Sequence, residues 1–337
     1  MSSRFSREAL ITSSLLIALL ASVAVALSQG AIDLDLTAVF LGEARGIDTE
    51  VLSNIRAPRV ALAAAAGAGL AASGAVRQGL FRNPLADPGL IGVSGGAAVG
   101  AMAMIVLGAS LNLPPIILAY SIPTAAILAS LVVTSILFLF ASRHGSFNVA
   151  TVLLAGIAIN AIASVFIGIF QYASDDGQLR TLTFWMMGSF GRASWATVIP
   201  AILAITGAFF LLLSQTRDLD RLQLGDAEAF YLGVNVQRVK VVIVFAAALS
   251  VGVAVSLSGI IGFVGLVVPH IVRFTVGVTH TSLVICSALL GASLLVMADL
   301  GARLIMMPAE VPVGLVTSAI GGPFFLWLIV RKVPNAF

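Results

Sequence analysis

The side chains that most often do chemistry are few in this chain and lie far apart along it. The single cysteine, Cys286, sits in an apolar stretch, and the three histidines are His144, His270 and His280. No intrachain disulfide can form, and no Cys/His spacing typical of a bound metal occurs. The sequence also lacks a His-Glu-x-x-His motif, a pair of catalytic carboxylates and a Walker A motif. We therefore expect no metal site and no catalysis on this chain, so that any ATP and Mg²⁺ would be bound by another subunit.

One catalytic pattern does occur, but chance explains it better. Gly92-Val-Ser-Gly-Gly96 matches the G-x-S-x-G motif of serine hydrolases. That motif requires a strand before it and a helix after it, with an acid and a histidine further along the chain. Here it opens an apolar helix in a sequence with 32 glycines and no convincing strands. We therefore do not interpret its serine as a nucleophile.

The composition excludes a soluble protein. Of the 337 residues, 59% are hydrophobic and 10% are charged, whereas about 45–50% and about 25% are usual in globular domains. Eighteen basic and fifteen acidic residues cannot cover the wetted surface of a soluble chain of this length. A soluble enzyme and a nucleic-acid-binding protein are thus excluded, and we expect an integral membrane protein surrounded by a lipid bilayer.

Charge-free windows long enough to cross a bilayer recur along the whole chain. A crossing helix needs about 20 apolar residues. The first window follows Arg4 and Arg7, as in a signal peptide, but it is too long for a cleaved signal and predicts a retained helix. The predicted spans are Ala9–Ser28, Val60–Val76, Leu90–Ala109, Ile116–Phe140, Val149–Tyr172, Trp195–Ser214, Val241–Ser258, Gly262–Gly277, Ser282–Ala298 and Val311–Val330. The sequence thus predicts an all-α polytopic protein with about ten helices in a single transmembrane domain, residues 1–337.

The basic residues predict the orientation of these helices. With the N-terminus inside, twelve of the eighteen basic residues fall on the cytoplasmic side, in agreement with the positive-inside rule. Ten spans then place both termini in the cytoplasm. The second to fifth and the seventh to tenth helices enter the membrane with opposite orientations, which is compatible with an inverted repeat of the kind found in many transporters.

Ionisable residues within the spans would indicate a proton or ion relay. The predicted spans place none at mid-membrane, since Asp299 and Glu310 lie at outer helix ends and Arg273 lies near an inner one. This argues against proton-coupled secondary transport. Sodium coupling through the carbonyls of broken helices stays open, so an ion-coupled secondary transporter is the alternative of another class.

One predicted cytoplasmic loop, residues 215–238, differs from the others. Asp226 and Glu228 would occupy the first turn of a short helix, where acidic side chains are favourable, and Gly233 would end it. Four apolar residues recur at helical spacing and form a face on this helix: Ala227, Phe230, Tyr231 and Val234. The helix either lies on its own bundle or fits a groove in a cytoplasmic partner.

Several motifs together carry a family resemblance over nearly the whole chain. They are Arg56-Ala-Pro-Arg59, Ser73-Gly-Ala-Val-Arg-Gln78, Asn83-Pro-Leu-Ala-Asp-Pro88, Gly92-Val-Ser-Gly95, Trp185-Met-Met-Gly-Ser189, Leu224-Gly225, Leu232-Gly-Val234, Gly262-Phe-Val-Gly-Leu-Val-Val-Pro-His270, Asp299-Leu-Gly-Ala-Arg303, Glu310-Val-Pro312, Gly314 and Gly321-Gly-Pro323. In this order they resemble the FecCD permease family, the membrane subunits of ABC importers for cobalamin, iron-siderophores and haem.

The resemblance implies partners and residue roles. It implies a homodimer in the bacterial inner membrane with the translocation path between two copies, two cytoplasmic ATP-binding subunits and a periplasmic substrate-binding protein. The implied coupling residues are Leu224, Gly225, Asp226, Glu228, Phe230, Tyr231 and Gly233. The implied cytoplasmic gate is Asn148, Val149, Ala150 and Thr151. Arg56, Arg59 and Arg303 match positions that grip acidic residues of the binding protein, although arginines at a membrane surface can also simply extend to the headgroups.

The substrate is the weakest part of the resemblance. The stretch from Asp175 to Trp185 is most similar to the haem-importer branch, although a related Leu-Arg pair occurs in cobalamin permeases. The implied path residues are Asn160, Ser164, Gln171 and Arg180. An arginine near the outer mouth could pair with the two propionates of haem. No Tyr/His ligand set for haem iron is evident, and His270 belongs to a family-wide Pro-His pair that we interpret as structural. Haem is therefore the predicted cargo, with ferric siderophores and cobalamin as alternatives.

Overall fold

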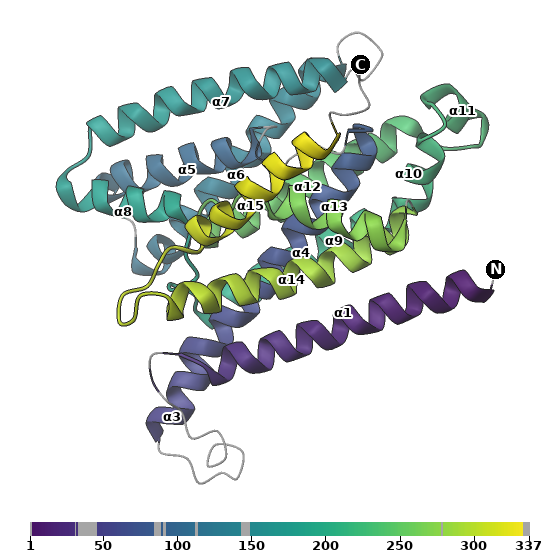
Figure 1. The fold of residues 1–337 in the computed structure, drawn as a ribbon. Helices are drawn as coiled ribbons and strands as arrows, with labels where there is room; N and C mark the ends of the chain where they lie inside the picture. The colour runs from purple at the N-terminus through teal and green to yellow at the C-terminus, as the bar shows by residue number, and fades with distance from the viewer. Residues whose placement is uncertain are drawn as a thin grey trace.

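The computed structural model describes residues 2–30, 32, 46–83, 89, 92–111, 114–142, 149–277 and 279–332, and all regular secondary structure within them is helical (Figure 1). The α-helices are α1 (Ser2–Ser28), α3 (Gly46–Glu50), α4 (Ala57–Leu80), α5 (Val93–Leu107), α6 (Pro115–Ser142), α7 (Val149–Tyr172), α8 (Asp176–Met187), α9 (Trp195–Ser214), α10 (Thr216–Leu222), α11 (Asp226–Tyr231), α12 (Val236–Ser258), α13 (Val264–Val276), α14 (His280–Leu304) and α15 (Val313–Lys332). A π-helical turn, η1 (Val51–Arg56), joins α3 to α4, and a 3-10 turn, η3 (Gly108–Leu111), follows α5.

The predicted all-α membrane class is confirmed. Seven helical segments of the described part are long and apolar enough to cross a membrane, and three shorter helices are also apolar. The seven are Arg7–Ser28, Gly46–Leu80, Tyr120–Ala141, Thr151–Tyr172, Trp195–Ser214, Val236–Ser258 and His280–Leu304, and the shorter ones are Val93–Leu107, Val264–Val276 and Val313–Trp327. Each predicted span overlaps one of these helices, although several of the bounds differ. The number of crossings, the side of the termini and the inverted repeat stay predictions.

The second predicted span begins too late. The helical path is continuous from Gly46 through η1 and α4 to Leu80, whereas the charge-free window that predicted this span begins only after Arg59. Both Arg56 and Arg59 lie inside the helical segment and are buried. A charged residue is tolerated there because its guanidinium group finds partners within the bundle, as described below.

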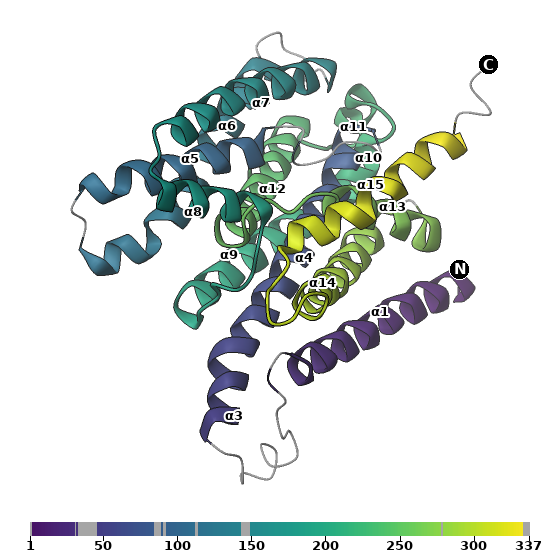
Figure 2. The same cartoon turned by 60° about the vertical axis from the view of Figure 1, so that its left-hand side comes forward.

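The most buried helices, α4, α12 and α14, form the centre of the bundle. α4 packs against α14, α12, α9 and α13. In both views α1 lies at one edge beside α14, and α5, α6 and α7 lie on the other side (Figures 1 and 2). Most residues of the α1 and α7 spans are exposed in the single chain, in contrast to those of α4, α12 and α14.

Glycines let the central helices α4 and α14 approach closely. A Cβ added at Gly67 of α4 would overlap the backbone carbonyl of Gly291 in α14, and a Cβ added at Gly291 would overlap that of Gly67. Lipid offers no hydrophobic drive for helix association, so membrane bundles rely on such close packing of small residues. The two helices therefore meet backbone to backbone at their middle.

The predicted break between the seventh and eighth spans is also present. α12 ends at Ser258, and Gly259 follows with a φ of 71°. A side chain there would overlap the carbonyl of Trp185, so this left-handed position requires glycine. The non-helical segment continues to Phe263, which has a φ of 67° and precedes α13.

Candidate functional site

The first group of candidate residues is an ionic cluster that joins α4 to α14. We call it the outer cluster because the predicted orientation places it at the outer surface, and its residues are Arg56, Arg59, Asp299, Arg303 and Glu310. Arg59 donates from Nε to Asp299 Oδ2 at 2.9 Å and from Nη2 to Asp299 Oδ1 at 2.9 Å. Its Nη1 donates to Glu310 Oε1 at 2.7 Å. Arg59 and Asp299 are almost fully buried, whereas the Glu310 side chain is 48% exposed. Arg59 thus holds one buried carboxylate and one carboxylate that reaches the surface.

The other two arginines of the outer cluster hold the end of α1. Arg303 lies 3.3 Å from Asp299 through Nε, and its Nη2 donates to the carbonyl of Ala26 at 3.1 Å. Arg56 Nη1 donates to the carbonyls of Leu27 and Ser28 at 2.8 and 2.9 Å. The last carbonyls of a helix have no partner within the helix and carry partial negative charge. Arg56 and Arg303 therefore cap the C-terminus of α1.

The structure thus brings the three predicted docking arginines together, but it also gives each of them internal partners. Arg56, Arg59 and Arg303 are 4, 7 and 7% exposed. This burial is at odds with the alternative that they extend to lipid headgroups. Together with Pro308 and Glu310 they line a cavity of about 160 Å³. Docking of a binding protein at this cavity stays a prediction.

The second group is the loop at residues 215–238, which folds into α10 and α11. The predicted short helix is present as α11, between Gly225 with a φ of 137° and Gly233 with a φ of 81°. Phe230 and Tyr231 project from it, 69% and 87% exposed, and their rings meet edge to face with centroids 6.2 Å apart. Val234 follows the end of α11 and is buried, so the prediction that it shares one face with Phe230 and Tyr231 is wrong: the chain turns at Gly233 and packs Val234 against the bundle.

Charged contacts fix α11 to the bundle. Lys240 of α12 forms an ion pair with Asp226, and Arg82 lies 3.7 Å from the same carboxylate. Arg82 also donates to the carbonyl of Leu222 at the end of α10. Asp226 therefore holds the base of α11 in place, beyond the effect of its charge on the helix N-terminus. Sequence analysis missed Lys240 and Arg82, because neither is near Asp226 along the chain.

A second junction, also missed, joins α10 to the start of α14. Nδ1 of His280 lies 2.5 Å from Oδ1 of Asp220, and the backbone N–H of His280 donates to the same oxygen at 3.0 Å. His280 is 2% exposed. The sequence offers one signal for this contact: a histidine at the predicted cytoplasmic end of one span, together with an acid in a different predicted cytoplasmic loop.

The predicted path residues share one region but form no single cluster. Asn160 and Ser164 are one turn apart on α7, where Asn160 donates to the carbonyl of Gly89 at 3.1 Å. Gln171, near the end of α7, donates to the sulfur of Met186 on α8 at 3.8 Å. Arg180 is exposed on α8, with its guanidinium carbon 5.8 Å from the centre of the Phe184 ring.

The predicted gate lies at the start of α7. Val149 and Ala150 form its first turn, and Thr151 is exposed. Asn148 lies outside the residues that the structure describes. The structure thus locates three of the four predicted gate residues at the N-terminal end of α7.

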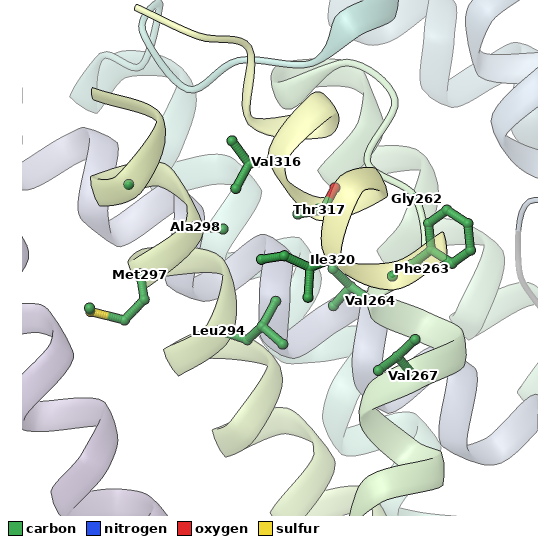
Figure 3. Close-up of a pocket in the computed structure, with 12 residues that line it drawn as sticks. Gly262, Phe263, Val264, Val267, Leu294, Met297, Ala298, Val316, Thr317 and Ile320 are labelled. Carbon is green, nitrogen blue, oxygen red and sulfur yellow. The ribbon is translucent and has the colours of Figure 1, made fainter. Parts of the chain in front are cut away.

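An apolar pocket outside the predicted sites lies between α13, α14 and α15 (Figure 3). It has a volume of about 320 Å³, and Val267, Leu294 and Ile320 are among the side chains that surround it. The hydroxyl of Thr317 in its lining donates to the carbonyl of Gly314 at 3.1 Å. Among the described residues, no group of three or more His, Cys, Asp or Glu side chains could hold a metal ion here or elsewhere.

Comparisons with known proteins agree with this geometry. The chain is 50% identical over 279 residues to the hemin transport system permease protein HmuU of Yersinia pestis, covering 83% of each chain. It is 41% identical over 286 residues to the vitamin B12 import system permease protein BtuC of Vibrio cholerae, covering 85% of this chain and 84% of BtuC. A solved metal-chelate type ABC transporter in an inward-facing conformation superposes with a TM-score of 0.85 and 32% identity, over 95% of this chain and 99% of the other. The profile of the FecCD transport family matches residues 15–331, and the chain belongs to that family.

Proposed function

We propose that this chain is the membrane-spanning permease subunit of an ATP-driven importer that carries haem inward across the bacterial inner membrane. The observation that carries the proposal is the projection of Phe230 and Tyr231 from a loop that Asp226 fixes to the bundle. Exposed aromatic side chains on a rigid helix suit a groove in a protein partner better than they suit water. The relatives that share this chain's length are named as permeases of transport systems.

The proposed assembly follows from the family. Two copies of the chain form the path between them, with ten crossings in each copy and both termini in the cytoplasm. Two ATP-binding subunits hold ATP and Mg²⁺ and dock on the coupling loops, while a periplasmic binding protein delivers the cargo. Most of α7 is exposed in the single chain, which leaves its apolar surface open to contact with lipid or with a second copy.

The outer cluster suits the docking of an acidic protein. The cavity there is lined by three arginines, and Glu310, one of the two carboxylates that the described residues place against Arg59, is half exposed. A carboxylate of the binding protein can take the place of Glu310 on Arg59 while Asp299 stays bonded, so that Arg59 never loses its charge partner. Charge complementarity of this kind steers the diffusional encounter of two proteins and fixes how the binding protein is oriented on the permease.

The path would follow the polar residues of α7 and the neighbouring α8. Asn160, Ser164 and Gln171 recur along α7 at spacings that keep them near one face. Arg180 on α8 is free of ion pairs within the described residues and could donate bidentate hydrogen bonds to a propionate. The start of α7, residues 148–151, would close the inner end as the gate.

Haem is proposed as the cargo because of the 50% identity to the hemin permease. The test is ATPase activity of the permease with its ATP-binding subunits in proteoliposomes. Candidate binding proteins loaded with haem, a ferric siderophore or cobalamin are added in turn. We expect the haem-loaded protein to stimulate hydrolysis most. Stimulation by only one of the other two would overturn the cargo but not the importer, and stimulation by none would overturn both.

A further inference from the structure

The central helices α4 and α14 run antiparallel and touch at three levels. At one end Arg59 pairs with Asp299. At the middle Gly67 meets Gly291. At the other end Gly79 of α4 faces the ring of His280, because a Cβ added at that glycine would overlap Nε2 of the imidazole. Contacts at both ends and at the middle make the two helices one stiff unit, the α4–α14 pair.

The length of this pair matches the thickness of a membrane. His280 and Asp299 are 19 residues apart on α14, which corresponds to about 28 Å at 1.5 Å per residue. The hydrocarbon core of a bilayer is about 30 Å thick. The His280 junction and the outer cluster therefore lie at the two ends of one rigid element, near opposite membrane surfaces.

The inner end of the pair is bonded to the coupling loop through both helices. On α14, the backbone N–H of His280 donates to Asp220 of α10 and Nδ1 of its ring lies 2.5 Å from the same oxygen. The hydroxyls of Thr281 and Thr216 are 2.8 Å apart. On α4, the carbonyl of Gly79 accepts from Nε2 of Gln223 at 3.1 Å. A movement of α10 must therefore either carry the α4–α14 pair with it or break these hydrogen bonds.

The Asp220 carboxylate makes the strongest of these contacts. Hydrogen bonds that involve an ionised group are about twice as strong as neutral ones. The imidazole also has one preferred orientation. Its Nδ1 contacts Asp220, whereas its Nε2 has no hydrogen-bond partner among the described residues, so a flipped ring would give up the contact with Asp220. Hydrogen-bonded contacts between rigid helices are one of the means by which proteins couple distant sites.

We propose that Asp220 and His280 are the positioning contact through which movement of α10–α11 displaces the α4–α14 pair and, with it, the outer cluster. The inference rests on the proposed function, since it assigns the route between the ATPase face of the loop and the docking face of the cluster. Coupling between two sites is reciprocal. The same contact therefore carries the stimulation of ATP hydrolysis when a binding protein docks at the outer cluster.

The test uses the assembled complex of permease and ATP-binding subunits in proteoliposomes. The measured quantity is the ratio of the ATPase rate with loaded binding protein to the rate without it. The variants are Asp220→Ala, His280→Ala, the double variant and His280→Asn, which keeps an N–H donor close to the position of Nδ1. The matched control is Ser282→Ala, because Ser282 lies on the same turn of α14 but donates to Glu8 of α1, at 2.6 Å, and not to α10.

We expect the ratio to fall about fivefold or more in each alanine variant, the lower end of ordinary coupling between sites. The double variant should be no worse than either single variant, because the two residues form one contact. His280→Asn should retain more of the ratio than His280→Ala, and Ser282→Ala should keep the wild-type ratio. A merely structural role would instead lower the yield and thermal stability of the complex without changing the ratio.

Two results would overturn the proposal: a wild-type ratio in both alanine variants, or losses that add in the double variant. If the alanine variants do not assemble, the ATPase ratio of Asp220→Asn tests the proposal instead, because asparagine keeps the shape of the aspartate side chain and removes its charge. A reduced ratio in that variant supports the proposal, and an unchanged ratio overturns it. A wild-type complex that no loaded binding protein stimulates contradicts the proposed function instead, so the two failures are distinguishable.

Discussion

Arg59 and Asp299 form a buried bidentate ion pair although 240 residues separate them along the chain. The pair joins the start of α4 to the end of α14, and Glu310 accepts from the remaining nitrogen of the guanidinium group. Removal of one partner from a buried ion pair is far more costly than the pair is favourable, because it leaves an uncompensated charge out of water. The outer cluster therefore has a structural role, in addition to the docking role that we propose for it.

Replacement of Asp299 tests that structural role. Asp299→Asn leaves Arg59 buried with the Glu310 charge alone, and we expect a loss of about 3–5 kcal/mol in stability. The control is Asp218→Asn, whose pair with Arg221 is half exposed and should contribute at most about 1 kcal/mol. Thermal unfolding of the detergent-solubilised permease measures both. Equal shifts for the two variants would contradict the structural role.

Removal of the Glu310 charge tests the docking role of the same cluster. Glu310→Gln leaves the cavity beside Arg56 and Arg303 more positive. We therefore expect faster association of an acidic binding protein, most clearly at low ionic strength. The matched control is Asp218→Asn, which makes the same change in net charge within the coupling loop. The measurement is the association rate of the binding protein with the nanodisc-embedded complex at low and at high salt. Equal association rates for Glu310→Gln and Asp218→Asn would argue against docking at the outer cluster.

The exposed aromatic pair of α11 predicts the site of ATPase attachment. Burial of such a side chain is worth roughly 1.5–3 kcal/mol. Phe230→Asp or Tyr231→Asp should therefore release the ATP-binding subunit or uncouple it while the bundle stays folded. Met306→Asp is the control, since Met306 is also a large exposed apolar side chain, 61% exposed, but follows α14 on the side of the outer cluster. Co-purification of the subunit with both loop variants at wild-type amounts would rule out this attachment.

The crossing of α4 and α14 predicts a strong difference between two glycines of one helix. Gly291→Ala places a methyl group against the backbone of Gly67, and overpacking of this kind costs about 1–3 kcal/mol. Gly301→Ala meets no atom within 4 Å and should stabilise α14 by roughly 0.5–1 kcal/mol through helix propensity. Thermal unfolding of the two variants should shift in opposite directions. Shifts of the same sign would mean that α4 and α14 do not cross at Gly67 and Gly291.

Arg180 provides the test of the haem path. A propionate that loses water needs a donor, and a guanidinium supplies two parallel hydrogen bonds where an ammonium supplies a point charge. Arg180→Ala should slow haem uptake roughly tenfold, equivalent to about 1.4 kcal/mol, and more than Arg180→Lys does. ATP hydrolysis without cargo should persist. Arg192→Ala, another exposed arginine, is the control, and equal uptake by the two alanine variants would remove Arg180 from the path.

The helices themselves could be predicted well from the sequence. The spans Val149–Tyr172 and Trp195–Ser214 were predicted with the bounds that the structure gives, because polar residues flank a charge-free window in both cases. Long apolar periodic segments carry their own signal. The start of α4 escaped prediction because the hydropathy of a window does not show that Arg56 and Arg59 have partners in the fold.

The candidate sites could be predicted only in part, for a related reason. The glycines that bound α11 are local signals, so the short helix was predictable. The inward turn of Val234 and the pairing of Asp226 with Lys240 depend on how the loop lies against α12. The contacts of Asp220 with His280 and of Arg59 with Asp299 join residues 60 and 240 positions apart. A single sequence indicates that such residues exist but not which of them meet.

Uptake of labelled haem into proteoliposomes tests the central claim most directly. The vesicles contain the permease and its ATP-binding subunits, the haem-loaded binding protein is added on the side of the outer cluster, and ATP is supplied on the side of α11. The account predicts haem accumulation that requires both ATP and the binding protein and that stops when the ATP-binding subunit is omitted. Accumulation by the permease alone, driven by a sodium or proton gradient without ATP, would contradict it.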